Sequence, residues 1–133
     1  MNPVDALTAV VRGEDAAVYA YEVAGARVGR PARRRAVSAL DSHRAHRSKA
    51  AALLAQAGGS VPGAAPAYEL PADVDRPAGA KAALAQVDNA LVATYADAAG
   101  ALAGEQRRWA ARAAAEYAAS AVSWGAPTQA FPT

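Results

Sequence analysis

The sequence predicts an all-α protein, a four-helix bundle with a long crossover between its second and third helices. Apolar residues recur at alternating steps of four and three over four long stretches, which is the spacing of the buried stripe of a bundle helix. Glycine and proline separate these stretches, and alanine, the best helix former, dominates the composition. A chain of 133 residues can bury one core but not two, so we expect a single domain over residues 1–133.

Composition excludes several classes of function. The chain has no cysteine, which excludes disulfides and thiolate metal sites. Its formal net charge of +2 is too small to require a nucleic-acid partner. Glycine and proline interrupt the uncharged runs, so we expect no membrane span, and Asn2, Pro3 and Asp5 stand where a basic and apolar leader would be. We therefore expect a cytoplasmic protein with neither nucleic-acid nor membrane partners.

The first predicted helix covers about residues 3–28 and has one charged residue, Glu14, on its otherwise uncharged inner face. Asn2 at the N-cap, Pro3 at the first helical position and Asp5 in the first turn all favour a helix start. The inner stripe consists of Leu7, Val11, Glu14, Val18, Tyr21, Gly25 and Val28. Because an ionised carboxylate in line with the core is costly unless something neutralises it, the partner of Glu14 is the main functional question.

The second predicted helix covers about residues 31–57 and ends at a Gly-Gly pair. Its inner face consists of Ala36, Leu40, His43, Arg47, Ala50, Leu54 and Ala57. On a helical wheel Arg47 falls near the middle of this face and His43 within about 40° of it, whereas His46 falls to one side. Four arginines crowd the start of the helix: Arg30, Arg33, Arg34 and Arg35. We interpret them as a solvated basic corner in preference to an anion site.

The segment between residues 58 and 77 contains four prolines and is predicted to cross over. About 20 extended residues can reach about 60 Å, whereas a helix of about 25 residues is about 38 Å long. The segment can therefore travel the length of the bundle, which would make the second and third helices parallel. Tyr68 and Leu70 are the expected anchors that hold the crossover against the bundle.

The third and fourth predicted helices cover about residues 78–102 and 105–124. The inner stripe of the third consists of Leu84, Val87, Leu91, Tyr95, Ala98 and Leu102, and that of the fourth of Trp109, Ala113, Tyr117, Ser120 and Trp124. Asp88 lies within about 40° of the first stripe and Glu116 at the margin of the second. We interpret the aromatic residues as core. Two short turns and one long crossover describe a ferritin-like bundle.

Four stretches of the chain belong together as a pattern: EDAAVYAYE at 14–22, SHRAHR at 42–47, PAYELP at 66–71, and VDNA at 87–90 with Tyr95 beyond it. This pattern resembles a bacterial family of ferritin-like domains of unknown function. The resemblance covers almost the whole chain and implies a ferritin-like fold and no established activity. The tail Phe131-Pro132-Thr133 resembles the Phe-Pro-Gly ending of that family but differs in its last residue.

The ligand set of a di-iron centre is incomplete in this sequence. Catalytic ferritin-like proteins place one carboxylate on each of two helices and a Glu-x-x-His on each of the other two. Glu14 and Asp88 fit the two carboxylates. The residue three before His43 is a leucine, however, and the residue three after Glu116 is an alanine. Arg47 adds a permanent positive charge to the face that a cation would occupy, so we expect no di-iron centre.

Three interpretations of the inward-facing charges remain. The favoured one is a buried polar network of Glu14, His43, Arg47 and Asp88, in which Glu14 pairs with Arg47, and Asp88 with His43. The second is a mononuclear Zn, Mn or Fe site built from Glu14, His43, Asp88 and Glu116. The third is a small anion bound to Arg47 and His43 between helices. Only the second interpretation requires a cofactor, a divalent metal.

We therefore expect a non-catalytic bundle that works by association, with no catalytic residue and no cofactor. The alternative is a divergent metal-binding or oxidase-type protein of the ferritin-like class. Tyr19 and Val23 lie outside the inner stripe of the first helix and form a second apolar strip. Because ferritin-like bundles often pair through their first two helices, this strip motivates the hypothesis of a homodimer.

Overall fold

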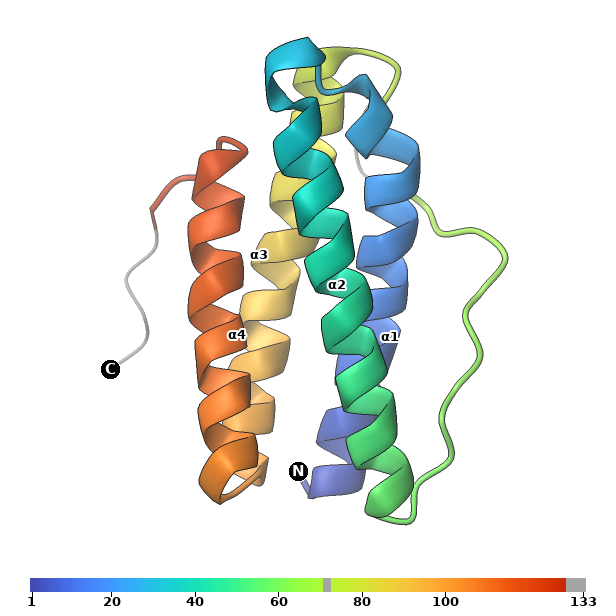
Figure 1. Ribbon diagram of the computed structural model, residues 1–133, viewed down its shortest axis with the longest axis vertical. Helices are drawn as coiled ribbons and strands as arrows, with labels where there is room; N and C mark the ends of the chain where they lie inside the picture. The colour runs from blue at the N-terminus through green and yellow to red at the C-terminus, as the bar shows by residue number, and fades with distance from the viewer. Residues whose placement is uncertain (71–72, 129–133) are drawn as a thin grey trace.

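The computed structural model describes residues 1–70 and 73–128, and its regular elements there are all helical. They are α1 (Pro3–Ala24), the 3-10 helix η1 (Gly25–Arg27), α2 (Arg30–Gln56), α3 (Pro77–Ala101) and α4 (Gly104–Ser123) (Figure 1). The predicted helix ends agree within one residue except for the last turn of the first helix, which is η1. The tail Phe131-Pro132-Thr133 lies outside the described residues.

Local sequence signals explain where the helices begin. The side chain of Asn2 accepts a hydrogen bond from the backbone N–H of Asp5 at 2.9 Å, as an N-cap does. Gly29 turns the chain into α2 with a φ of 94°, a conformation that favours glycine. None of the helices in the described ranges combines the length and apolar character that crossing a membrane requires.

The long crossover between α2 and α3 confirms the predicted topology. It travels the length of the bundle on the side of α1, so α2 and α3 run in the same direction and α4 runs opposite to both (Figure 1). The ring of Tyr68 packs against Tyr19 with their centroids 5.6 Å apart, and Leu70 is half-buried against the upper part of the core. The strip predicted for a homodimer is therefore partly covered by Tyr68, and the homodimer itself stays a prediction.

The helices pack as two antiparallel pairs that meet along one seam. The pair α1–α2 contacts the pair α3–α4 through α1 and α3. No α-carbon of α2 lies within 8 Å of an α-carbon of α4, so these two helices face each other across a wider interval (Figure 1). Only side chains that reach well into the bundle can therefore bridge α2 and α4.

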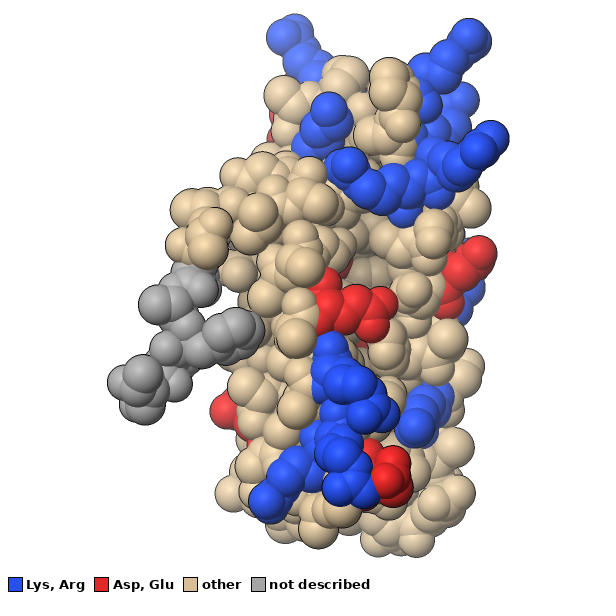
Figure 2. All heavy atoms as spheres, turned by 60° about the vertical axis from the view of Figure 1, so that its left-hand side comes forward, with Lys and Arg blue, Asp and Glu red and all other residues tan. Residues whose placement is uncertain are grey.

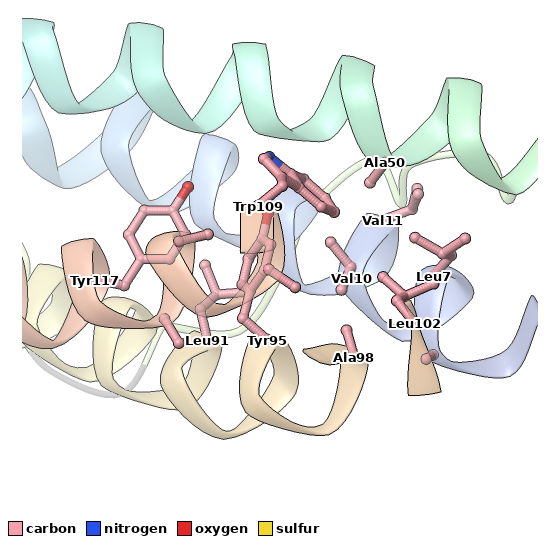
Figure 3. Close-up of a cluster of buried hydrophobic side chains, with 14 of the residues drawn as sticks. Leu7, Val10, Val11, Ala50, Leu91, Tyr95, Ala98, Leu102, Trp109 and Tyr117 are labelled. Atoms are coloured by element: carbon pink, nitrogen blue, oxygen red, sulfur yellow. The ribbon is translucent and has the colours of Figure 1, made fainter. Parts of the chain in front are cut away.

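A polar layer divides the core into two apolar clusters. The larger cluster is shown in Figure 3 and includes Leu7, Val10, Val11, Leu91, Tyr95, Leu102, Trp109 and Tyr117. The second cluster, toward the other end of the bundle, includes Tyr21, Val28, Leu84 and Trp124. On α2 and α3 the polar residues His43 and Asp88 fall between the members of the two clusters. The core is therefore interrupted at one level by charge.

Arginine side chains gather at the end of the bundle where α2 begins (Figure 2). The exposed members of this basic corner are Arg27, Arg30, Arg33, Arg34 and Arg35. Arg35 also contacts α4: its Nη2 donates to the backbone oxygen of Ser123 at 3.1 Å, and its guanidinium lies 4.0 Å from the centre of the Trp124 ring. This contact satisfies a carbonyl at the C-terminus of α4, where a positive charge is favoured.

Candidate functional site

The centre of the polar layer is a histidine held between two carboxylates. His43 on α2 lies with its Nδ1 2.6 Å from Oε1 of Glu14 on α1, and with its Nε2 2.8 Å from Oδ1 of Asp88 on α3. All three side chains are buried, each with 1% or less of its surface exposed. One imidazole ring therefore joins three helices in the middle of the bundle.

The protonation state of His43 follows from its partners. An ionised carboxylate only accepts hydrogen bonds, so bonds from both ring nitrogens require a proton on each. Burial of the ring acts to lower the pKa of His43, but the hydrogen bonds with Asp88 and Glu14 and their charges outweigh it and raise the pKa from 6.5 to about 9. His43 is therefore an imidazolium at neutral pH, and the three groups together carry one net negative charge.

The second oxygen of Glu14 is bound by two tyrosines. The hydroxyls of Tyr95 on α3 and Tyr117 on α4 each lie 2.7 Å from Oε2 of Glu14. Burial, and then the Glu14 charge, raises the pKa of both tyrosines far above the ordinary value. Both hydroxyls therefore keep their protons and act as donors to the carboxylate.

Asp88 is satisfied in the same way at the other end of the histidine ring. Its Oδ2 accepts from the hydroxyl of Tyr21 at 2.6 Å and from that of Ser120 at 2.5 Å. Tyr21 in turn accepts from Nε1 of Trp124 at 2.8 Å. Burial, and then the Asp88 charge, raises the pKa of Tyr21 far above the ordinary value, so this hydroxyl also stays protonated.

The network reaches the surface through the second histidine. Nδ1 of His46 lies 2.7 Å from the Tyr117 hydroxyl, and its Nε2 lies 3.7 Å from Oε2 of Glu116, a side chain that is about half exposed. A tyrosine hydroxyl has one proton to give. Because Tyr117 gives it to Glu14, the Nδ1–H of His46 is the donor to Tyr117. The hydrogen-bonded chain therefore runs from His46 through Tyr117 to the buried Glu14.

The predicted pair between Glu14 and Arg47 is wrong. Arg47 donates from Nε to Oδ1 of Asp15 at 2.5 Å, at the margin of the interface between α1 and α2. About a third of the Arg47 side chain is exposed. The long aliphatic part of the Arg47 side chain lets its guanidinium reach the edge of the interface. His43, one turn earlier on α2, binds the Glu14 oxygen that faces α2. Asp15, which the sequence did not single out, neutralises Arg47.

The candidate metal ligands are not arranged around a common centre. The structure brings Glu14, His43 and Asp88 together, but the imidazolium stands between the carboxylates and has no lone pair to offer a metal. Glu116 lies toward His46 near the surface. Within residues 1–70 and 73–128, no three histidine, aspartate or glutamate side chains are placed to hold a metal ion.

The sequence did not reveal the hydroxyl donors of the network. The three tyrosines and Ser120 lie on the predicted inner stripes, the tyrosines were interpreted as core, and His46 was placed to one side. A signal was available on α1 and α3, where an inward-facing tyrosine follows an inward-facing carboxylate by seven residues. On α4, Tyr117 and Ser120 place two hydroxyls on the inner face, three residues apart. A buried carboxylate needs several donors, and tyrosine supplies them from an apolar surface.

Two comparisons with known proteins agree with this fold. The family described as "Domain of unknown function (DUF4439)" matches residues 6–133. The crystal structure described as that of a conserved hypothetical protein, Rv2844, from Mycobacterium tuberculosis is similar with a TM-score of 0.87 and 26% sequence identity, over 92% of this chain and 93% of that chain. A comparison with curated proteins found no significant match.

Proposed function

The chain belongs to the family of domains of unknown function DUF4439, and we propose that it is a ferritin-like bundle that acts as a non-catalytic binding protein. In this proposal a charged histidine occupies the place where the catalytic members of the ferritin-like class hold iron. The protein then uses its bundle as a rigid scaffold and works by association with another molecule.

One observation carries the proposal: both nitrogens of His43 are bonded to carboxylates in the middle of the bundle. In this proposal Glu14 and Asp88, on the first and third helices, correspond to the two single carboxylates of a di-iron site. The positive charge between them comes from the imidazolium, and hydroxyls satisfy the remaining carboxylate oxygens. In this arrangement one positive charge and several hydroxyl donors, all from the protein, compensate the buried carboxylates, as buried charges require.

The alternative of a mononuclear Zn, Mn or Fe protein makes opposite demands on His43. A metal ligand must be a neutral imidazole with one free nitrogen, so metal binding would remove a proton from His43 and separate it from one carboxylate. The proposal and the alternative therefore differ in a measurable property, the protonation of one ring.

The test combines metal analysis with nuclear magnetic resonance of the two histidines in the sequence. The protein is purified without chelator, its metal content is measured, and the ring nitrogens are observed before and after addition of Zn, Mn and Fe(II) salts. We expect no stoichiometric metal, an imidazolium signal for His43 at neutral pH, and no change in melting temperature on adding chelator. His46→Gln is the matched control because it identifies the signal of His43 by elimination.

Stoichiometric metal in the purified protein, together with a melting temperature that chelator lowers, would refute the proposal. A neutral His43 in a metal-free protein would refute it as well, because the carboxylates would then lack their counter-charge.

A further inference from the structure

A small cavity lined mainly by residues with polar side chains lies between α2 and α4, on the open side of the bundle. Its volume is about 190 Å³, below the 300–1,000 Å³ typical of pockets for drug-sized ligands. Its floor includes the rings of His43 and Tyr117, which are stacked with centroids 4.5 Å apart and an angle of 6° between their planes. The cavity, called the α2–α4 pocket below, is lined by Arg35, Ser38, Ala39, Ser42, His43, Glu116, Tyr117 and Ser120.

The walls of the α2–α4 pocket offer hydroxyl groups on both sides. Ser38 and Ser42 stand on successive turns of α2, and neither hydroxyl has a hydrogen-bond partner within residues 1–70 and 73–128. Ser120 on α4 gives its proton to Asp88, so its oxygen can only accept from a further group. The pocket therefore has donors and acceptors available on α2 and an acceptor on α4.

Charges of opposite sign mark the two ends of the pocket. Because α2 and α4 are antiparallel, the start of α2 lies at the same end of the bundle as the end of α4 (Figure 1). Arg35, near the start of α2, donates to the backbone oxygen of Ser123 at the end of α4. Glu116 lies seven residues before Ser123, about 10 Å away along the helix at 1.5 Å per residue. One hydrogen bond has satisfied one of the five N–H donors of Arg35, and the others can bind a ligand.

The floor of the pocket disfavours a simple anion. Glu14 and Asp88 outweigh the single charge of His43, and Glu116 adds another negative charge at the rim. The anion site on Arg47 and His43, the third interpretation of the sequence, also lacks its donors, since Arg47 is bonded to Asp15 and both nitrogens of His43 are bonded to carboxylates. A ligand with both charges fits the pocket better, because its positive end balances the negative floor and its negative end meets the arginine.

We propose that the α2–α4 pocket binds a small zwitterion, an ω-amino acid, with its carboxylate on Arg35 and Ser38 and its ammonium on Glu116 and Ser120. Because Arg35 and Glu116 stand toward opposite ends of the pocket, the two charges of the ligand must also be separated, as they are in an ω-amino acid and not in an α-amino acid. 4-Aminobutanoate, which has three methylene groups between its ends, is a short member of this class. The inference rests on the binding role proposed above and names the class of ligand.

The probe is 4-aminobutanoate, with butanoate and butylamine as controls that each lack one charge. Binding to the full chain is measured by calorimetry and by shifts of the backbone amides of Ser42 and Ser120. We expect 4-aminobutanoate to bind in the millimolar range, about tenfold more tightly than either control, since each end adds a charged hydrogen bond in a half-open site.

Two substitutions separate the ends of the pocket, and a third serves as a control. Arg35→Gln should weaken 4-aminobutanoate about tenfold and leave butylamine unchanged, whereas Glu116→Gln should weaken butylamine and leave butanoate unchanged. Arg34→Gln removes a neighbouring arginine of the basic corner that does not line the pocket, so it should leave the affinity for 4-aminobutanoate and for both controls unchanged. Thermal melts verify that each variant is folded.

Equal affinity for the three compounds, no saturable binding, or an equal loss with Arg34→Gln and Arg35→Gln would overturn the ligand proposal. A metal-free protein with a charged His43 that fails these binding tests would overturn this inference and leave the metal-free core in place. Stoichiometric metal together with intact binding of 4-aminobutanoate would overturn the metal-free core and leave this inference in place.

Discussion

The Nδ1 atom of His43 lies 2.6 Å from Oε1 of Glu14, and both side chains are buried. This contact makes the charge on the histidine part of the stability of the fold. A buried pair of this kind is often no more stabilising than a well-packed apolar pair, but the loss of one partner leaves an uncompensated charge in a medium of low dielectric. The first two predictions follow from this asymmetry.

Stability should fall as the pH rises from about 6.5 to about 9. The pKa of His43 is about 9 in the folded protein and 6.5 without its partners, so the folded state binds the proton more tightly. The contribution is fully present below 6.5, decreases as the pH rises and is lost above about 9, with a size of up to about 3 kcal/mol. Urea unfolding at several pH values measures it. His46→Gln should retain the decrease, and an unfolding free energy that rises over this interval would contradict the prediction.

Glu14→Gln should destabilise the protein much more than Asp15→Asn. The first change leaves the buried imidazolium with one carboxylate and should cost about 3–5 kcal/mol. The second breaks a pair whose arginine is about one-third exposed, and should cost about 1 kcal/mol. Chemical unfolding of both variants measures the difference. Equal losses would mean that the network does not hold Glu14 as described.

Tyr21, Tyr95 and Tyr117 should resist ionisation until the protein unfolds in alkali. Burial and the neighbouring carboxylates raise the pKa of all three. Ultraviolet absorbance during an alkaline titration should therefore show their ionisation together with the loss of helical circular dichroism. Tyr95→Phe should remove one phenolate from that late step and cost about 1.5–3 kcal/mol, the range for a hydrogen bond to a charged group. Tyr19→Phe, which leaves the network intact, is the control.

Arg47 should be coupled energetically to Asp15 and not to Glu14. Arg47→Ala should cost roughly 1–3 kcal/mol, because it leaves the buried carboxylate of Asp15 without its hydrogen-bond partner. A double-mutant cycle with Asp15→Asn should show that coupling, whereas the cycle with Glu14→Gln should be close to additive. Strong coupling between Arg47 and Glu14 would contradict this prediction and support the pairing expected from the sequence.

Periodicity was sufficient to predict the helices, and loop length was sufficient to predict the parallel α2 and α3. The stripes also identified Glu14, His43 and Asp88 as inward-facing groups. The partner of Glu14 could not be predicted in the same way, because a helical wheel gives the direction of a side chain but not its height relative to another helix. Arg47 and His43 share a face of α2, and only the axial position of α2 against α1 decides which of them meets Glu14.

The polar layer also fixes how far each helix is shifted along its neighbours. Small apolar residues such as the alanines of this core can slide by one turn, about 5.4 Å, and still find apolar contacts. A slip of α3 by one turn would remove Asp88 from His43 and leave two carboxylates and an imidazolium incompletely paired, at a cost of several kcal/mol. In a bundle so rich in alanine, the contacts of His43 therefore favour one axial alignment of α1, α2 and α3 over alignments shifted by a turn.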